Sequence, residues 1–66
     1  MWPGFLTGQT DKPVRVILID DDANMSRVIA NELLADLRID LVGQGSSVRE
    51  GRRLISQYAF DVMLVD

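Results

Sequence analysis

The sequence predicts an α/β protein built on a doubly wound parallel sheet, with its elements in the order strand, helix, strand, helix, strand. Two nearly uninterrupted apolar runs, at residues 14–19 and 61–66, predict strands, and the first is typical of a parallel strand that is buried on both faces. Between them lie two stretches in which apolar residues recur every three or four positions, as in helices with one buried face. The chain has 66 residues, of which 47% are hydrophobic, so we expect at most one small globular domain.

The first half of the chain is expected to form a leader, a strand and a helix. Residues 1–13 hold both prolines and show no regular period, which predicts a flexible leader. The strand over 14–19 stops at three consecutive aspartates. Either Asp22 or Asn24 can cap the helix that follows, which we place over 24–36. Its expected buried face consists of Met25, Val28, Ile29, Leu33 and Leu37.

The second half of the chain repeats this pattern. Residues 39–42 predict a short strand, which the glycines and the serine of residues 43–46 are expected to end as a turn. Ser47 and Glu50 match a capping box, in which the two side chains satisfy each other's backbone amides at a helix start. A third strand over 61–66 again ends in aspartate. The expected buried face of the second helix consists of Val48, Gly51, Leu54, Ile55 and Tyr58.

The composition limits the chemistry that is open to the chain. It has no cysteine and no histidine, which excludes Cys/His nucleophiles, Ser/His/Asp triads and zinc sites of the HExxH type. Ten Asp and Glu against seven Lys and Arg give a net charge of -3, which argues against nucleic acid or an anionic membrane as a direct partner. No apolar run approaches the ~18 residues of a membrane span. Because the N-terminus also lacks the pattern of a signal peptide, we expect a soluble cytoplasmic protein.

Three aspartates stand where the predicted sheet would bind a ligand. In open parallel sheets ligands bind beyond the carboxyl ends of the strands, and Asp20, Asp21 and Asp66 lie at the ends of the first and third strands. If these strands are neighbours, about 4.8 Å apart, their carboxylates converge. Carboxylates this close repel unless a cation joins them, and an all-oxygen site completed by waters suits magnesium better than calcium. Each aspartate taken singly could instead end a strand or cap a helix, and we assign Asp22 to the cap.

Residues 16–22, with the Asn24-Met25-Ser26-Arg27 that follows, resemble the first strand and acidic pair of receiver domains in bacterial two-component response regulators. Residues 61–66 resemble the third strand of these domains, which ends in the phospho-accepting aspartate. The helix, strand and helix between the two segments also fit in length. The resemblance covers about residues 14–66 and implies a flavodoxin-like sheet with the strand order 2-1-3.

The resemblance implies a role for each of the three aspartates. Asp66 would take a phosphoryl group from the phosphohistidine of a sensor histidine kinase or phosphotransfer protein, forming an acyl phosphate. Asp21 would ligate Mg²⁺ directly, Asp20 chiefly through water, and Asp66 would share the ion. A bridging metal can supply much of what this transfer needs, namely positioning and charge neutralisation. The chain would then be a signalling phosphoprotein rather than an enzyme, acting on an output domain or effector outside these residues.

The receiver pattern is incomplete here. Receivers continue after the acceptor through two more strands that supply a metal-binding carbonyl, a Thr or Ser and a Lys, whereas the one lysine, Lys12, precedes the first strand. We therefore expect residues 14–66 to be the N-terminal part of a receiver domain, with very weak or absent phosphorylation on their own. We also expect the apolar third strand to self-associate, through edge pairing or exchange of elements.

Two other functions stay open at this point. The segment Gly43-Gln44-Gly45-Ser46-Ser47-Val48 follows a strand, opens a helix and precedes Asp66 at the next strand end, which nearly matches the dinucleotide fingerprint of an oxidoreductase. Its last residue stands where the third Gly or Ala belongs, and this interpretation leaves the three aspartates after the first strand without a role. The other function is a receiver-like module that binds partners and is never phosphorylated. Such a partner could contact Arg49, Arg52 and Arg53, which could equally form a solvated helix face.

Overall fold

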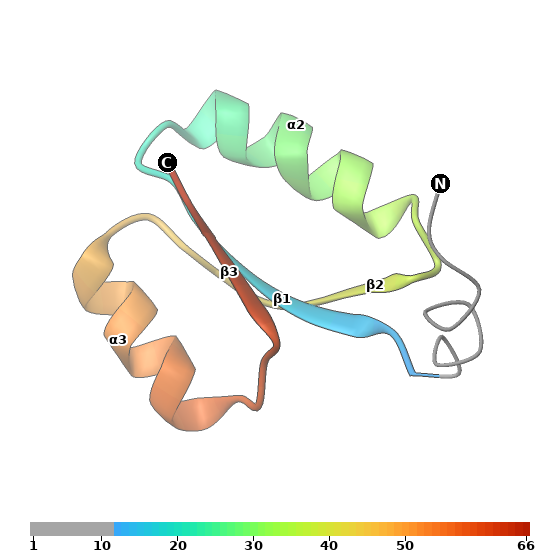
Figure 1. The fold of residues 1–66 in the computed structure, drawn as a ribbon. Helices are drawn as coiled ribbons and strands as arrows, with labels where there is room; N and C mark the ends of the chain where they lie inside the picture. Colours follow the sequence, from blue (N-terminus) through green and yellow to red (C-terminus); the bar gives the residue numbers. More distant parts are fainter. Residues whose placement is uncertain (1–11) are drawn as a thin grey trace.

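The computed structural model describes residues 12–66 and confirms the predicted α/β fold. The elements in chain order are β1 (Val14–Ile19), α2 (Ala23–Leu34), β2 (Ile39–Gly45), α3 (Val48–Gln57) and β3 (Val62–Val65), as Figure 1 shows. The strands form one parallel sheet in the order β2-β1-β3, which is the order that the resemblance implied. Of the predicted leader, all but Lys12 and Pro13 lies outside the described residues.

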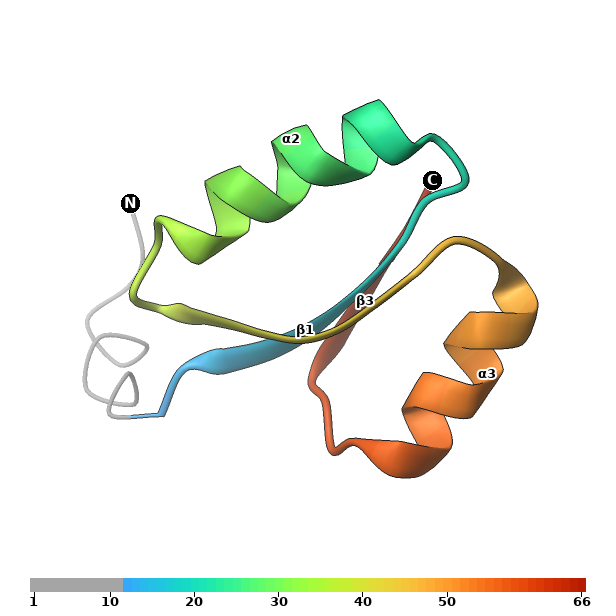
Figure 2. The ribbon, with the colours of Figure 1, turned by 180° about the vertical axis from the view of Figure 1, so that it is seen from behind.

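The two helices cover opposite faces of the sheet. α2 lies on one side and α3 on the other, in the view of Figure 1 and in the reverse view of Figure 2. This arrangement follows from right-handed crossovers, because the chain passes from β1 to β2 in one direction along the sheet and returns past β1 to β3 in the other. Because β1 and β3 are parallel neighbours, their carboxyl ends, which Asp20 and Asp66 follow, lie at the same edge of the sheet.

The core is centred on β1, because this strand pairs with a neighbour on each side. Its last four residues, 16–19, are almost completely buried, and Ala30 of α2 is the other buried apolar residue of the described chain. The prediction that this apolar run is a strand buried on both faces is confirmed. The strand ends at Asp20, which is itself buried.

β2 is longer than the sequence predicts, and the turn expected at residues 43–46 is wrong. The strand runs to Gly45, with a register shift that leaves Val42 unpaired against β1. A Cβ on Gly43 would lie 3.1 Å from Leu54 of α3, and a Cβ on Gly45 would lie 3.0 Å from the Cβ of Glu50. The glycines therefore let α3 approach the strand closely instead of ending it.

α2 buries a different face from the one that the apolar spacing predicts. Met25, Val28 and Leu37 are exposed, Ile29 and Leu33 are half-buried, and the buried residues of the helix are Ser26 and Ala30. α2 contacts β1 and β2 but not β3, so a face with small residues packs against the sheet. Leu37 lies beyond the end of α2, which the structure places at Leu34 rather than at residue 36.

α3 also leaves much of its predicted buried face uncovered. Val48, Ile55 and Tyr58 are exposed, while Gly51 is buried and Leu54 is half-buried. Like α2, this helix packs against two strands only. α3 contacts β1 and β2, and its backbone does not come close to that of β3. Within residues 12–66, both faces of β3 are therefore only partly covered.

Side chains cap both helices, although the capping box differs in detail from its prediction. Asp22 Oδ1 accepts hydrogen bonds from the amides of Asn24 (2.9 Å) and Met25 (3.1 Å), which confirms the assignment of Asp22 as a cap. Ser47 caps α3 by accepting from the amide of Glu50 at 3.2 Å. The reciprocal bond to Ser47 is not formed: the Glu50 carboxylate accepts instead from the hydroxyl (2.8 Å) and the amide (3.4 Å) of Ser46. These bonds hold the pKa of Glu50 below its ordinary value.

Candidate functional site

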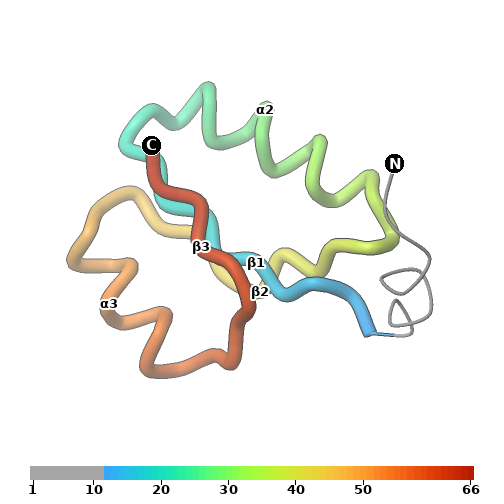
Figure 3. Tube along the Cα trace, viewed as in Figure 1, coloured from blue at the N-terminus to red at the C-terminus, as the bar shows by residue number. Residues whose placement is uncertain are grey.

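The carboxyl ends of the three strands are joined by backbone hydrogen bonds. The amide of Asp20 donates to the carbonyl of Gly45 at the end of β2 (3.1 Å), and the amide of Asp66 donates to the carbonyl of Ile19 at the end of β1 (3.0 Å). Figure 3 shows the end of β3 beside the loop that joins β1 to α2, and the reverse view agrees. The predicted acceptor Asp66 therefore lies at the same edge of the sheet as the acidic residues that follow β1.

Asp20 is the only acidic residue among residues 12–66 that is buried. Its residue surface is 2% exposed, and its Oδ1 accepts a hydrogen bond from the amide of Asp22 (2.9 Å). Its Oδ2 is also buried, but no group in the described residues donates a hydrogen bond to it. A buried carboxylate oxygen without a partner is costly unless a water or a cation lies beside it.

The other acidic residues of this edge are accessible to solvent. Asp21, Asp22 and Asp66 are exposed, and Asp22 is engaged in the cap of α2. Among residues 12–66, no group of three or more Asp, Glu, His or Cys lies close enough together to hold a metal ion. The structure therefore brings Asp66 next to the end of β1 through the backbone, without closing the side chains of Asp20, Asp21 and Asp66 into one cluster. The assignment of these three residues as metal ligands stays a prediction.

An ion pair at the opposite edge of the sheet accompanies the register that brings Asp66 to β1. The guanidinium and amide of Arg15 donate to Asp61 at 2.9 to 3.3 Å, and the amide of Asp61 donates to the carbonyl of Arg15 at 2.8 Å. The bonds from Arg15 lower the pKa of Asp61 and raise the pKa of Arg15. From this start, Val16 pairs with Val62 and Ile19 with Val65. Sequence analysis missed this pair, since Asp61 was assigned only to the third strand.

A second contact that the sequence pattern does not reveal lies at the α2 end of the acidic loop, residues 20–26, which lead from β1 into α2. The side-chain amide of Gln44 donates a 2.7 Å hydrogen bond to the hydroxyl of Ser26, which is buried in the first turns of α2. No sequence signal marks this pair, because it depends on β2 extending past the glycine of residue 43. The sequence pattern instead predicts Gln44 to lie in a turn.

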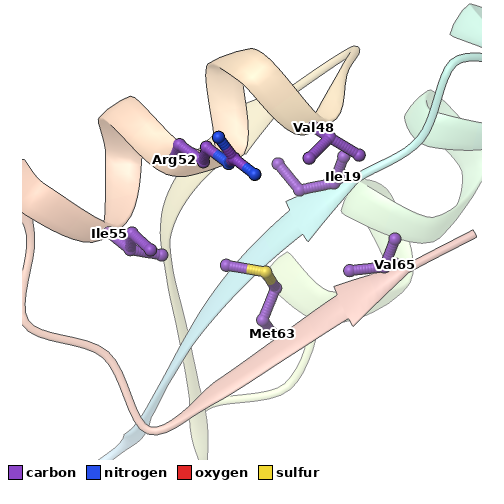
Figure 4. Close-up of a pocket in the computed structure, with 7 residues that line it drawn as sticks. Ile19, Val48, Arg52, Ile55, Met63 and Val65 are labelled. Carbon is purple, nitrogen blue, oxygen red and sulfur yellow. The ribbon is translucent and has the colours of Figure 1, made fainter.

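An apolar pocket of about 100 Å³ lies on the face of the sheet that α3 covers. It is separate from the acidic edge, the edge of the sheet where Asp20, Asp21 and Asp66 lie. Figure 4 shows the side chains that line it between α3, β1 and β3, with the guanidinium of Arg52 as the only charged group. No described carboxylate lines this pocket, so it has no part in the acidic site. Its lining residues are Ile19, Val48, Gly51, Arg52, Ile55, Met63 and Val65.

The geometry does not support the dinucleotide alternative. Gly43 and Gly45 lie within β2 rather than in a loop, and no glycine of the described residues has a positive φ. β1 also separates the glycine-bearing strand from β3, at whose end Asp66 lies. A dinucleotide site needs a glycine turn that brings the backbone to the pyrophosphate and an acidic residue within reach of the ribose. Neither requirement is met by residues 43–48 and Asp66.

Comparison with known proteins finds one bacterial relative for this stretch. Over 54 residues, 82% of the chain, the sequence is 33% identical to the protein-glutamate methylesterase/protein-glutamine glutaminase 1 of Rhizobium johnstonii. The chain spans 16% of that protein's length, so it is similar to one segment of it. No family model and no solved structure matches the chain. Neither helix in residues 12–66 has the length and apolar character needed to cross a membrane.

Proposed function

We propose that residues 14–66 form part of a phospho-accepting receiver domain of a two-component response regulator, located in the cytoplasm, with Asp66 as the acceptor. The observation that carries this proposal is the buried, unpartnered Oδ2 of Asp20 at the end of β1. β1 is the direct neighbour of β3, the strand that Asp66 follows. The strand order β2-β1-β3 supports it, because this order makes the two acid-bearing strands neighbours. The similarity to a segment of a bacterial protein is consistent with a module that occurs within longer chains.

The chemical type of the donors at the acidic edge suits magnesium. All candidate ligands are carboxylate oxygens, and the exposure of Asp21 and Asp66 leaves room for the waters that magnesium retains. In this proposal Asp21 would hold the ion directly, Asp20 would hold it chiefly through water, and Asp66 would share it. When bound, magnesium supplies neutralisation of the charge on the phosphoryl and acceptor oxygens.

The chemical step assigned to Asp66 needs no histidine in this chain. A carboxylate oxygen of Asp66 forms a bond to the phosphorus of a phosphohistidine on a sensor kinase, and the bond from phosphorus to the imidazole nitrogen breaks. The electron pair stays on the imidazole, which can then take up a proton. The hydrogen bond from the Asp66 amide to Ile19 holds the acceptor at the sheet edge, so the chain's own contribution is positioning.

Phosphorylation by a small-molecule phosphodonor, followed by intact-mass and peptide mass spectrometry, tests the acceptor assignment. We expect at most a slow reaction, and any phosphoryl group bound by the chain should lie on Asp66, require Mg²⁺ and disappear in the Asp66→Asn variant. Asp40→Asn is the matched control, because Asp40 is an exposed aspartate at the opposite end of the sheet, beside Arg15. A phosphoryl group on Asp20, Asp21 or Asp40, or modification that is independent of magnesium, would contradict the assignment.

A receiver-like module that only binds partners is the second candidate. It is favoured by Arg49, Arg52 and Arg53 of α3, which are exposed and form no salt bridge within the described part of the chain. A sensor kinase, an output domain or an effector would be the partner in either case. Saturable magnesium binding at the acidic edge favours the phospho-accepting function, since a module that only docks through α3 has no use for a cation there.

A further inference from the structure

Two consecutive residues at the end of β2 hold both ends of the acidic loop. The carbonyl of Gly45 accepts from the amide of Asp20, where the loop leaves β1 (3.1 Å). The side-chain amide of Gln44 donates to the hydroxyl of Ser26, where the loop has entered α2 (2.7 Å). Residues 20–26 are thus attached to the same short piece of β2 at their beginning and at their end.

Internal hydrogen bonds connect the residues of the loop between these attachments. The amide of Asp22 donates to Asp20 Oδ1 (2.9 Å), and the carbonyl of Asp22 accepts from the amide of Ser26 (2.8 Å). A continuous path therefore runs from Gln44 through Ser26 and Asp22 to the Asp20 carboxylate. Because Oδ1 is fixed by Asp22, the direction in which the free Oδ2 points depends on where the loop is held.

We infer that Gln44 is a positioning residue for the cation site, acting through its hydrogen bond to Ser26. The inference rests on the proposed function, since it concerns the same acidic edge. Groups that hydrogen-bond directly to metal ligands change metal affinity by roughly 10- to 100-fold when they are removed, and we expect an effect at the lower end of this range because Gln44 acts through Ser26 and Asp22. The position of Gln44 favours this role over simple stabilisation, because its residue is exposed and its amide can bind water if Ser26 is lost.

The Ser26→Ala variant separates positioning from stability. It removes the hydroxyl and leaves no buried group unpaired, because the exposed Gln44 amide can turn to solvent, so the unfolding midpoint should change little. We expect its dissociation constant for Mg²⁺, measured by NMR titration of the amides of residues 20, 21 and 66, to rise by about tenfold. Ser26→Thr keeps a hydroxyl and should retain most of the affinity.

Two further variants make the test specific. Ser56→Ala is the matched control, because Ser56 is an exposed serine of α3 whose hydroxyl donates only to the carbonyl of Arg53 (2.7 Å). Its magnesium affinity should equal that of the wild type. Gln44→Ala in the Ser26→Ala background should cause no further loss of affinity, since both variants break the same bond.

The outcomes distinguish this inference from the proposed function. If the wild-type chain binds Mg²⁺ and Ser26→Ala binds it equally well, the inference is wrong while the proposed function stands. A lower unfolding midpoint with unchanged affinity would show that the bond only stabilises the fold, and would also overturn the inference. If the wild type shows no saturable magnesium binding, the proposed function fails and the positioning role falls with it. Amide exchange at residues 21–25 would then still report whether Gln44 holds the loop as a purely structural contact.

Discussion

The amide of Asp66 donates a 3.0 Å hydrogen bond to the carbonyl oxygen of Ile19, the residue that precedes Asp20. This bond continues the parallel pairing of β1 and β3 by one residue past the last ladder pair, Ile19 with Val65. The backbone of the predicted phosphoryl acceptor is therefore fixed next to the strand end that carries the buried carboxylate. The position of Asp66 is a consequence of the register between β1 and β3, and the Arg15–Asp61 pair lies at the other end of the same two strands.

The first prediction concerns the cost of the buried Asp20 carboxylate. In metal-free buffer, Asp20→Asn should raise the free energy of unfolding by about 1 to 3 kcal/mol, because it removes a buried charge with an unpartnered oxygen. The Asn side chain can still accept from the amide of Asp22. Urea denaturation in EDTA measures the difference, and millimolar Mg²⁺ should reduce it by stabilising the wild type more than the variant.

Asp40→Asn is the control for this comparison, since Asp40 is exposed and lies at the far end of β2. Its unfolding free energy should stay close to that of the wild type in both buffers. A clear loss of stability in metal-free Asp20→Asn would contradict the interpretation that the buried Asp20 carboxylate destabilises the fold when no cation is bound.

The sequence allowed the order of elements, the end of the first strand and the two N-terminal caps to be predicted, because these depend on local patterns. The faces of the helices were harder to predict. Apolar spacing pointed to Met25 and Val28, but the close approach of α2 to β1 and β2 selects Ser26 and Ala30 instead. A small residue on the packed face of a helix gives no periodic signal, so such a choice depends on the distance between helix and sheet.

The same limit explains what sequence analysis missed at the candidate site. Glycines 43 and 45 predict a turn by composition, yet in the structure they are strand residues that make room for α3. The extension of β2 then brings Gln44 to Ser26 and the Gly45 carbonyl to Asp20. These contacts join residues far apart in the sequence, and they could not be predicted without the register between β1 and β2.

The second prediction concerns pH. Hydrogen bonds from the side chain and amide of Arg38 lower the pKa of Asp36 from 3.8 to about 2, so this carboxyl is protonated at lower pH in the folded chain than in the unfolded chain. The interaction therefore stabilises the fold above about pH 4, and this contribution is lost as the pH falls toward 2. An NMR titration should give the depressed pKa of Asp36 in the wild type and a higher pKa in Arg38→Gln, which still lies below 3.8 because the backbone amide of residue 38 keeps its bond to Asp36.

For the pH prediction, the unfolding curves of Asp36→Asn provide the check. This variant should lose less stability than the wild type between pH 4 and pH 2, although the effect is small because the pair is solvent-exposed. An Asp36 carboxyl that titrates at its ordinary value in the wild type would show that the Arg38 contact is not maintained in solution.

The third prediction concerns β3, whose outer edge is unpaired within residues 12–66. Val62, Leu64 and Val65 are exposed on this strand, and an apolar edge of this kind tends to pair with another strand. We predict concentration-dependent self-association in sedimentation velocity, reduced by Leu64→Lys. Leu37→Lys is the matched control, because Leu37 is 93% exposed and lies off the sheet. A wild-type chain that is monomeric at all concentrations and unfolds cooperatively would contradict this prediction.

The central claim is that the acidic edge binds a divalent cation through Asp20, Asp21 and Asp66. NMR titration of the chain with Mg²⁺ tests it most directly, with Asp20→Asn, Asp66→Asn and the control Asp40→Asn measured in parallel. We expect saturable shifts centred on the amides of residues 20, 21 and 66, affinity weakened by at least about tenfold in the first two variants, and unchanged affinity in the control. Shifts that do not saturate, or equal affinity in Asp20→Asn and the wild type, would contradict it.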